Sequence, residues 1–250
     1  MSAADEIPPH PAKFSDPIVH ALAKILKDEL THRIRELRAK LAAPDFVPPA
    51  ATMRLQVLDP FAGVGGIHAV GEHLDQVDTW GVEIEPEWAA AHPRTYVGDA
   101  LNLEFDEETF GVIMTSPAYG NRMADHFEAK DTSRRLTYRH QLGRALSDNN
   151  AGKLQWGDHY REFHRAAWIE AKRVLGVGGL FVVNVSDHIR AGKRVPVTAW
   201  HKETLVEIGL VFIREEKIET RRMRFGANNT ARVDHESILV FRKPRISNEI

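Results

Sequence analysis

Three carboxylates, Asp59, Glu83 and Asp99, each stand at or just after the end of a short apolar run, and a glycine-rich turn follows the first of them. The run VLDPFAGVGG reads as an apolar strand, an acid, a turn with three glycines and the start of a helix. Gly63 and Gly65 would let the backbone approach a ligand closely. Because the carboxyl ends of parallel strands line one crevice, we expect the three acids to face a single adenosine-like ligand. The alternative is that each acid separately caps a helix.

The charges of this predicted site favour a cationic ligand. Glu83 is placed where an acidic side chain can accept both ribose hydroxyls. The loop opens with Asp59 and contains no lysine, which disfavours a pyrophosphate. S-adenosyl-L-methionine carries adenine, ribose, an amino group and a sulfonium and therefore fits better. The neighbours of the acids complete the predicted cofactor site, which comprises Asp59, Phe61, Gly63, Gly65, Glu83, Ile84, Asp99 and Ala100.

Residues 59–65, DPFAGVG, resemble the cofactor motif of the amino-group DNA methyltransferases. The resemblance is to the short bacterial or bacteriophage type, including restriction-modification enzymes. It implies methyl transfer from S-adenosylmethionine to the N4 of cytosine or the N6 of adenine, with double-stranded DNA as the partner. Residues 10–14, HPAKF, resemble the segment that closes over the methionine end of the cofactor in that family.

A second motif, SPAY at Ser116, Pro117, Ala118 and Tyr119, follows an apolar run. The family has a small polar residue, two prolines and an aromatic here. An exocyclic amine is a poor nucleophile because its lone pair is delocalised into the ring. The Ser116 hydroxyl and the Pro117 carbonyl, holding the amine hydrogens, can draw the nitrogen toward a tetrahedral state as it attacks a methyl group. A base in a duplex must first be flipped out, and Tyr119 offers a face on which it can stack.

The residue types narrow the chemistry. Methylation at cytosine carbon 5 uses a cysteine nucleophile in the family that performs it, and this chain has no cysteine. Serine at the first motif position favours cytosine, with adenine as the alternative. Ala118 departs from the family, because a proline there would hold the preceding residue extended and remove an amide donor.

Basic residues are concentrated in the second half of the chain. Residues 1–111 hold 9 basic and 19 acidic side chains, whereas residues 112–250 hold 24 and 16. Such asymmetry indicates a charged partner on one side, and basic loops would form a rim around the second motif. The predicted nucleic-acid contacts are Arg134, Arg135, Arg190, Arg221, Arg222 and Arg224, and Arg144 belongs to the same basic loop as the first two. The histidines, His164 among them, lack a metal-binding spacing and are interpreted as surface or phosphate contacts, so we expect no metal.

The apolar pattern predicts a doubly wound α/β fold. Strands are expected at 55–59, 79–83, 95–97, 111–115, 180–186, 210–218 and 236–241, and helices near 65–74, 86–92, 160–175 and 198–208. This alternation predicts a Rossmann-like, seven-stranded, mostly parallel sheet whose last strand is antiparallel. Residues 1–54 are predicted to be an N-terminal extension with a long amphipathic helix, residues 55–250 the catalytic domain, and residues 120–158 an inserted target-recognition loop.

Neither a signal peptide nor a membrane helix is expected, so the sequence predicts a cytoplasmic protein. Two other functions stay open. One is an RNA methyltransferase acting on a guanine or adenine amine with a similar catalytic turn. The other is a binding protein that keeps the cofactor fold and has lost activity through Ala118.

Overall fold

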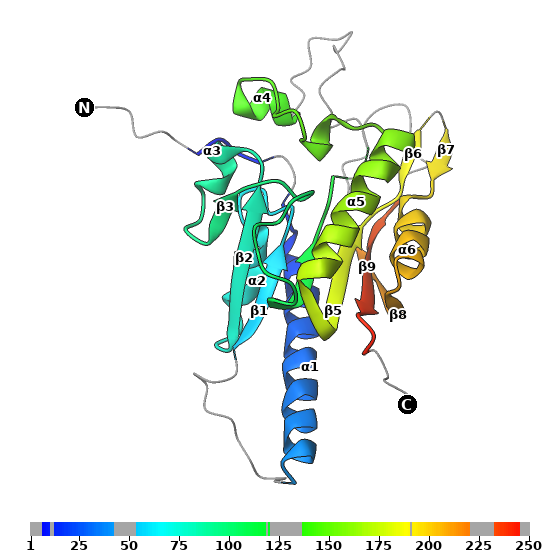
Figure 1. Cartoon of the computed structure of the whole chain (residues 1–250). Coiled ribbons are helices and arrows are strands. Elements are labelled where there is room, and N and C mark those ends of the chain that lie inside the picture. Colours follow the sequence, from blue (N-terminus) through cyan, green and yellow to red (C-terminus); the bar gives the residue numbers. More distant parts are fainter. Residues whose placement is uncertain are drawn as a thin grey trace, which may run out of the picture.

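The computed structural model describes residues 7–10, 13–42, 54–118, 120, 137–190, 192–220 and 233–245. Its centre is a seven-stranded sheet in the order β3-β2-β1-β4-β5-β9-β8 (Figure 1). Strands β3 to β5 are parallel, and β9 runs antiparallel to both of its neighbours, which confirms the predicted fold class. The strands are β1 (Leu55–Asp59), β2 (Val77–Glu83), β3 (Thr95–Val97), β4 (Phe110–Thr115), β5 (Leu175–Val185), β8 (Val211–Glu219) and β9 (His235–Arg242).

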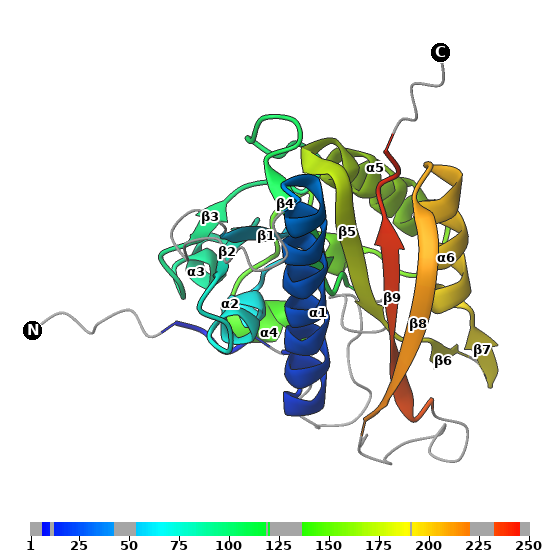
Figure 2. The ribbon, with the colours of Figure 1, turned by 90° about the horizontal axis from the view of Figure 1, so that it is seen from below.

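Helices cover both faces of this sheet (Figure 2). The helices are α1 (Asp16–Lys40), α2 (Gly66–Gly71), α3 (Pro86–Ala89), α4 (Tyr138–Leu142), the 3-10 turn η1 (Ala151–Lys153), α5 (Asp158–Val174) and α6 (Val197–Glu207). Helices α1 and α2 pack on one face, and α5 and α6 pack on the other. Consecutive residues such as Val57 and Leu58 in β1 point to opposite faces and are both fully buried, which is why the strands read as continuous apolar runs.

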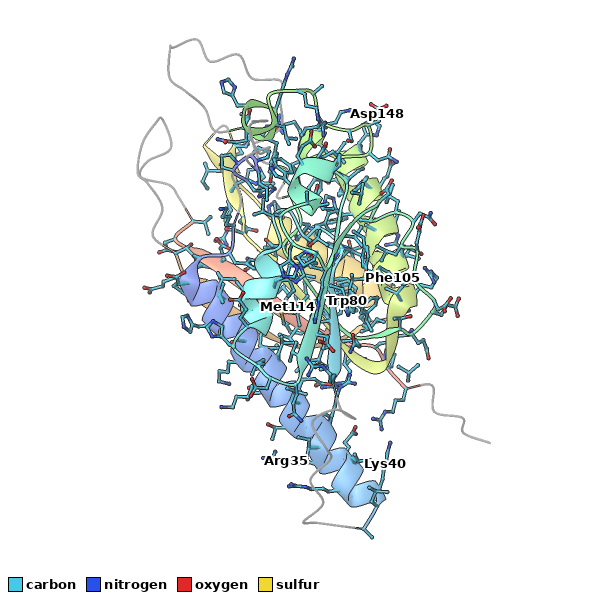
Figure 3. All side chains as sticks on the ribbon, turned by 90° about the vertical axis from the view of Figure 1, so that its left-hand side faces the viewer. Arg35, Lys40, Trp80, Phe105, Met114 and Asp148 are labelled. Carbon is cyan, nitrogen blue, oxygen red and sulfur yellow. The ribbon has the colours of Figure 1, made fainter. Side chains whose placement is uncertain are left out.

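The long N-terminal helix packs directly on the sheet. Ile18, Leu22, Ile25 and Leu26 are at most 2% exposed and join the apolar cluster on this face. Further along the helix the buried carboxylate of Glu29 pairs with Arg33 and Arg242. The last turns of α1, where Arg35 and Lys40 lie, extend away from the end of the molecule that carries Asp148 (Figure 3).

Two parts of the chain differ from the pattern that the sequence predicts. Strand β5 begins at Leu175, because Leu175 already pairs with Phe110 before the glycine run interrupts the register. A hairpin formed by β6 (His188–Arg190) and β7 (Lys193–Val195) lies outside the main sheet. These strands of three residues are too short to give an alternating pattern. Within the described ranges, no helix has the length and apolar character needed to cross a membrane.

The strand order reverses between β1 and β4, and this switch point positions the site. The chain leaves β1 toward β2 and β3 on one side and returns to β4 on the other. The loops that follow β1 and β4 therefore diverge and leave a crevice at the carboxyl ends of these strands. Asp59 ends β1, and Ser116 directly follows β4. The fold thus brings the two predicted motifs to one crevice.

Replacing Leu26 by Ala should destabilise the fold by about 2–5 kcal/mol, because it leaves a cavity between α1 and the sheet. Urea unfolding of the whole chain measures this change in the free energy of unfolding. The matched control is Leu41→Ala at the end of the same helix, where the side chain is 52% exposed and the expected change is within about 0.5 kcal/mol. Equal stabilities for the two variants would show that α1 is not part of the core.

Candidate functional site

The turn after β1 requires glycine. Gly63 and Gly65 have φ angles of 54° and 83°, which disfavour residues with a Cβ. A Cβ on Gly65 would also lie 2.6 Å from Cδ2 of His68, and one on Gly63 would lie 3.2 Å from the His10 ring. Helix α2 begins directly after Gly65. The glycines therefore allow a sharp, tightly packed turn whose backbone faces the crevice.

Glu83, at the end of β2, holds this turn in place. Its carboxylate is 8% exposed and accepts hydrogen bonds from the backbone N–H of Gly63 and of Glu85, both at 2.9 Å. Burial raises the pKa of Glu83 to about 7, against the opposing effect of the two amides. Each carboxylate oxygen has a second lone pair, so Glu83 can accept hydrogen bonds from two hydroxyl groups of a ligand in the cavity.

Asp59 connects the first motif to the second. Its Oδ1 accepts hydrogen bonds from the backbone N–H of Phe61 at 2.9 Å and from the hydroxyl of Thr115 at 2.6 Å. Thr115 ends β4 and directly precedes Ser116. Burial raises the pKa of Asp59 to about 7 as well. Among the described residues Oδ2 accepts no hydrogen bond, which leaves it available to a cation.

Asp99 follows β3 and is oriented by a residue distant in sequence. Its Oδ1 accepts a hydrogen bond from the N–H of Leu101 at 2.9 Å, and its Oδ2 accepts one from the side-chain amide of Asn149 at 2.7 Å. Asn149 lies in the segment that the sequence analysis assigns to target recognition. Part of that segment therefore forms a wall of the candidate cofactor site.

Glu85 attaches this wall to the rest of the molecule. Its carboxylate is fully buried and accepts hydrogen bonds from the N–H and the hydroxyl of Ser147, the amide of Asn150 and the guanidinium of Arg144, all within 3.0 Å. Arg144 also pairs with Glu87. Arg144 is predicted to belong to a basic rim for phosphate, but Glu85 and Glu87 neutralise its charge.

One cavity of about 810 Å³ contains the two motifs. Ten predicted site residues line it, namely Asp59, Phe61, Gly63, Gly65, Glu83, Ile84, Asp99, Ala100, Ser116 and Pro117. Six lining residues that sequence reasoning missed are Trp88, Tyr138, Asn149, Asn150, Phe163 and Asn184. No motif marks these six, because they reach the cavity through packing of α3, the wall, α5 and β5. The three acids share this cavity, which disfavours separate helix caps.

The segment before α1 lies against this cavity. The His10 ring packs edge-on against Trp88 at 4.4 Å between ring centroids, and the indole N–H of Trp88 donates a hydrogen bond to the carbonyl of Pro8 at 3.2 Å. His10, Lys13 and Phe14 line the cavity. Residues 11 and 12 lie outside the described residues, and closure of residues 10–14 over a cofactor stays a prediction.

The remaining predicted contacts are only partly within the described residues. Arg190 is exposed at the end of β6 and donates a hydrogen bond to the carbonyl of Trp156 at 3.4 Å. Outside the described residues lie Tyr119, Arg134, Arg135, Arg221, Arg222 and Arg224. His164 is fully buried, so its interpretation as a surface or phosphate contact was wrong. The described part of the chain contains no group of three or more side chains suited to hold a metal ion.

Comparisons with known proteins find remote likenesses among solved structures. No family model and no curated protein matches the sequence. Solved structures that match include a SAM-dependent methyltransferase from Aquifex aeolicus, at 10% identity, covering 76% of this chain and 84% of that chain, with a TM-score of 0.43. A geranyl diphosphate methyltransferase matches at 12% identity, with coverages of 76% and 71% and a TM-score of 0.47. A protein of Thermus thermophilus described as a DNA modification methylase matches at 20% identity, with coverages of 59% and 51% and a TM-score of 0.38. At this distance these likenesses do not define the chemistry of the site.

Glu83→Gln should weaken the binding of S-adenosylmethionine by about tenfold to hundredfold, because charge-assisted hydrogen bonds in a buried site are lost. Titration calorimetry measures the dissociation constant. Glu104→Gln removes the same charge from an exposed position outside the cavity and should leave it unchanged. Equal affinities for the two variants would remove Glu83 from the site.

The affinity for S-adenosylmethionine should also increase as the pH is raised from about 6 to about 8. Asp59 and Glu83 each have a pKa raised to about 7, so both are partly protonated at neutral pH. A cationic ligand favours the ionised carboxylates, so binding should release protons and weaken as the pH falls below 7. Calorimetry in buffers of different ionisation enthalpy detects this release. Neutral adenosine should depend less on pH, and equal slopes for the two ligands would contradict the argument.

Proposed function

We propose that this protein is an S-adenosylmethionine-dependent methyltransferase that acts on an exocyclic amine of a base in double-stranded DNA. One observation carries the proposal. The Asp59 carboxylate bonds both to the glycine-rich turn and to Thr115, so a cofactor site and the Ser116–Pro117 turn share one cavity. A cofactor-binding protein without activity would need the first motif only. Its cavity would have no reason to include an amine-holding turn.

The lining of the cavity suits S-adenosylmethionine. Its volume is within the range of about 300–1,000 Å³ that is usual for ligand sites. Glu83 has lone pairs for two ribose hydroxyls. Oδ2 of Asp59 accepts no hydrogen bond from the described residues and suits the positive end of the ligand. Asp99 can accept a hydrogen bond from the adenine amine, while Ile84 and Ala100 contact the adenine ring. Two buried acids with raised pKa values gain stability from a cation, which argues against an anionic cofactor.

When bound, S-adenosylmethionine supplies a methyl group activated by the sulfonium. The residues of the second motif would then act on the amine that receives it. The Ser116 hydroxyl and the Pro117 carbonyl would each accept one hydrogen bond from the amine, which directs the nitrogen lone pair out of the ring plane. The nitrogen would gain the methyl group as the bond from that methyl to sulfur breaks, and one amine proton would pass to water. Through its hydrogen bond with Thr115, Asp59 fixes the end of β4 beside the glycine-rich turn. No residue of the chain needs to form a covalent bond to the base.

The target base would be flipped from the duplex into the cavity, with cytosine favoured by the serine at the first motif position. Tyr119 would stack on the flipped base. Exposed Arg190 ends β6 in the basic β6–β7 hairpin, beside Trp156, and would contact phosphate. The basic loops with Arg134, Arg135, Arg221, Arg222 and Arg224 would complete the contact with the backbone. Residues of the segment 120–158 that do not belong to the wall would read the sequence.

The proposal is tested by incubating the protein with labelled S-adenosylmethionine and either duplex DNA or RNA, followed by nucleoside mass spectrometry. We expect N4-methylcytosine in DNA. If N6-methyladenine forms, the target base is adenine and not cytosine. If only RNA is methylated, the substrate is RNA and not DNA. No transfer to any nucleic acid, despite binding of the cofactor, would refute the proposal.

Ser116→Ala should slow methyl transfer by about 100-fold while leaving the cofactor affinity within about twofold, because the hydroxyl is needed by the amine only. Single-turnover kinetics and calorimetry measure the two effects. Thr109→Ala removes a hydroxyl from an exposed loop residue and should change neither. Loss of cofactor binding in Ser116→Ala would show that the catalytic assignment is mistaken.

A further inference from the structure

The catalytic turn receives a hydrogen bond where the family resemblance predicts a proline. The hydroxyl of Tyr160, on α5, lies 2.8 Å from the carbonyl oxygen of Ala118 and can donate to it. Tyr160 is fully buried. The same residue packs beneath the next part of the turn, since a Cβ on Gly120 would lie 3.0 Å from its ring. The N–H of Trp156 donates to the carbonyl of Gly120 at 3.0 Å. The start of α5 and the residues before it thus hold the backbone on both sides of position 119.

Two further buried side chains fix the proton of this hydroxyl. The indole N–H of Trp168 donates to Nδ1 of His201 at 3.1 Å, and Nε2 of His201 lies 3.0 Å from the hydroxyl oxygen of Tyr160. Indole can only donate, so Nδ1 must be the acceptor and the proton of the neutral imidazole must be on Nε2. The Nε2–H then donates to Tyr160, whose own proton is left for Ala118. One arrangement of protons satisfies all three hydrogen bonds.

The surroundings keep His201 neutral. His201 and Trp168 are both 0% exposed, and burial lowers the pKa of His201 well below its usual value. A second proton on the ring would have to sit on Nδ1, where it would oppose the indole N–H. The hydrogen bonds therefore run in one direction, from Trp168 on α5 to His201 on α6, back to Tyr160 on α5 and then to Ala118.

We propose that Trp168, His201 and Tyr160 are positioning residues that hold the catalytic turn at Ala118 and so replace the rigidity of the missing proline. This series of hydrogen bonds also contacts the glycine-rich turn, because the Trp168 ring packs edge-on against Phe61, with 5.7 Å between the ring centroids. Proline would restrict the turn by its ring, whereas a hydrogen bond to the carbonyl of Ala118 restricts it from outside. This inference rests on the proposed function for its catalytic consequence, but its structural content does not.

The first test uses the unmodified protein and needs no activity. Nitrogen-15 NMR of labelled histidine should show His201 protonated on Nε2 and not on Nδ1, with no titration between about pH 5 and 8. Assignment comes from loss of the signal in His201→Gln. A proton on Nδ1, or titration of the ring in this range, would overturn the chain of hydrogen bonds.

The second test removes the hydroxyl with Tyr160→Phe, alone and combined with Ala118→Pro. Alone, it should speed amide hydrogen exchange in the peptide spanning residues 116–120 and lower kcat by about tenfold, with unchanged affinity for S-adenosylmethionine. In the Ala118→Pro background, where the ring already restricts the turn, the same change should lower kcat by less than about twofold. Tyr96→Phe, on exposed β3, is the matched control and should affect neither measurement.

The outcomes separate the two proposals. Absence of methyl transfer by the unmodified protein would refute the proposed function, and the NMR and exchange measurements would still decide the positioning chain. If the unmodified protein transfers methyl groups and Tyr160→Phe changes neither amide hydrogen exchange nor kcat, the positioning role is refuted and the proposed function is not. Equal losses of kcat with and without Ala118→Pro would show that Tyr160 acts through general stability and not through the turn. Thermal melting of each variant verifies that it is folded.

Discussion

The carboxylate of Asp59 is the interaction on which the site depends. It ends β1 at the point where the strand order reverses, and it bonds to the turn on one side and to β4 on the other. A buried carboxylate is costly unless its charge is stabilised. Here a hydroxyl and an amide stabilise it in part, and its pKa remains raised to about 7. A cationic ligand in the site would therefore stabilise the ionised form of Asp59.

The second constraint is the buried carboxylate of Glu85. Four hydrogen bonds from Arg144, Ser147 and Asn150 converge on it, and together they attach a polar segment to the start of α3. This attachment positions Asn149 against Asp99. These buried hydrogen bonds hold the segment together with a small apolar cluster of Trp88, Tyr138 and Leu146. Recognition of the adenosine-like end of a ligand would therefore depend on residues more than forty positions apart in the chain.

The two motifs are held by different means. Glycine conformation and two carboxylates shape the glycine-rich turn, whereas Ala118 of the second motif is held by α5 and α6 through Tyr160 and His201. Since both arrangements rest on the same sheet and meet at Phe61 and Trp168, a shift of α5 would alter the two turns together.

The sequence by itself determined the sheet, its antiparallel last strand and the acids and glycines at the strand ends. These features are local, because strand periodicity, glycine conformation and the ends of parallel strands follow from neighbours in the chain. Only the tertiary structure decided that Arg144 is neutralised, that Asn149 orients Asp99 and that His201 and Tyr160 support the turn. Tyr160 is 42 positions from Ala118 and His201 is a further 41 from Tyr160, and no spacing in the sequence marks either pair. Such contacts depend on how helices pack on the sheet, which is fixed by the burial of whole faces and not by any short motif.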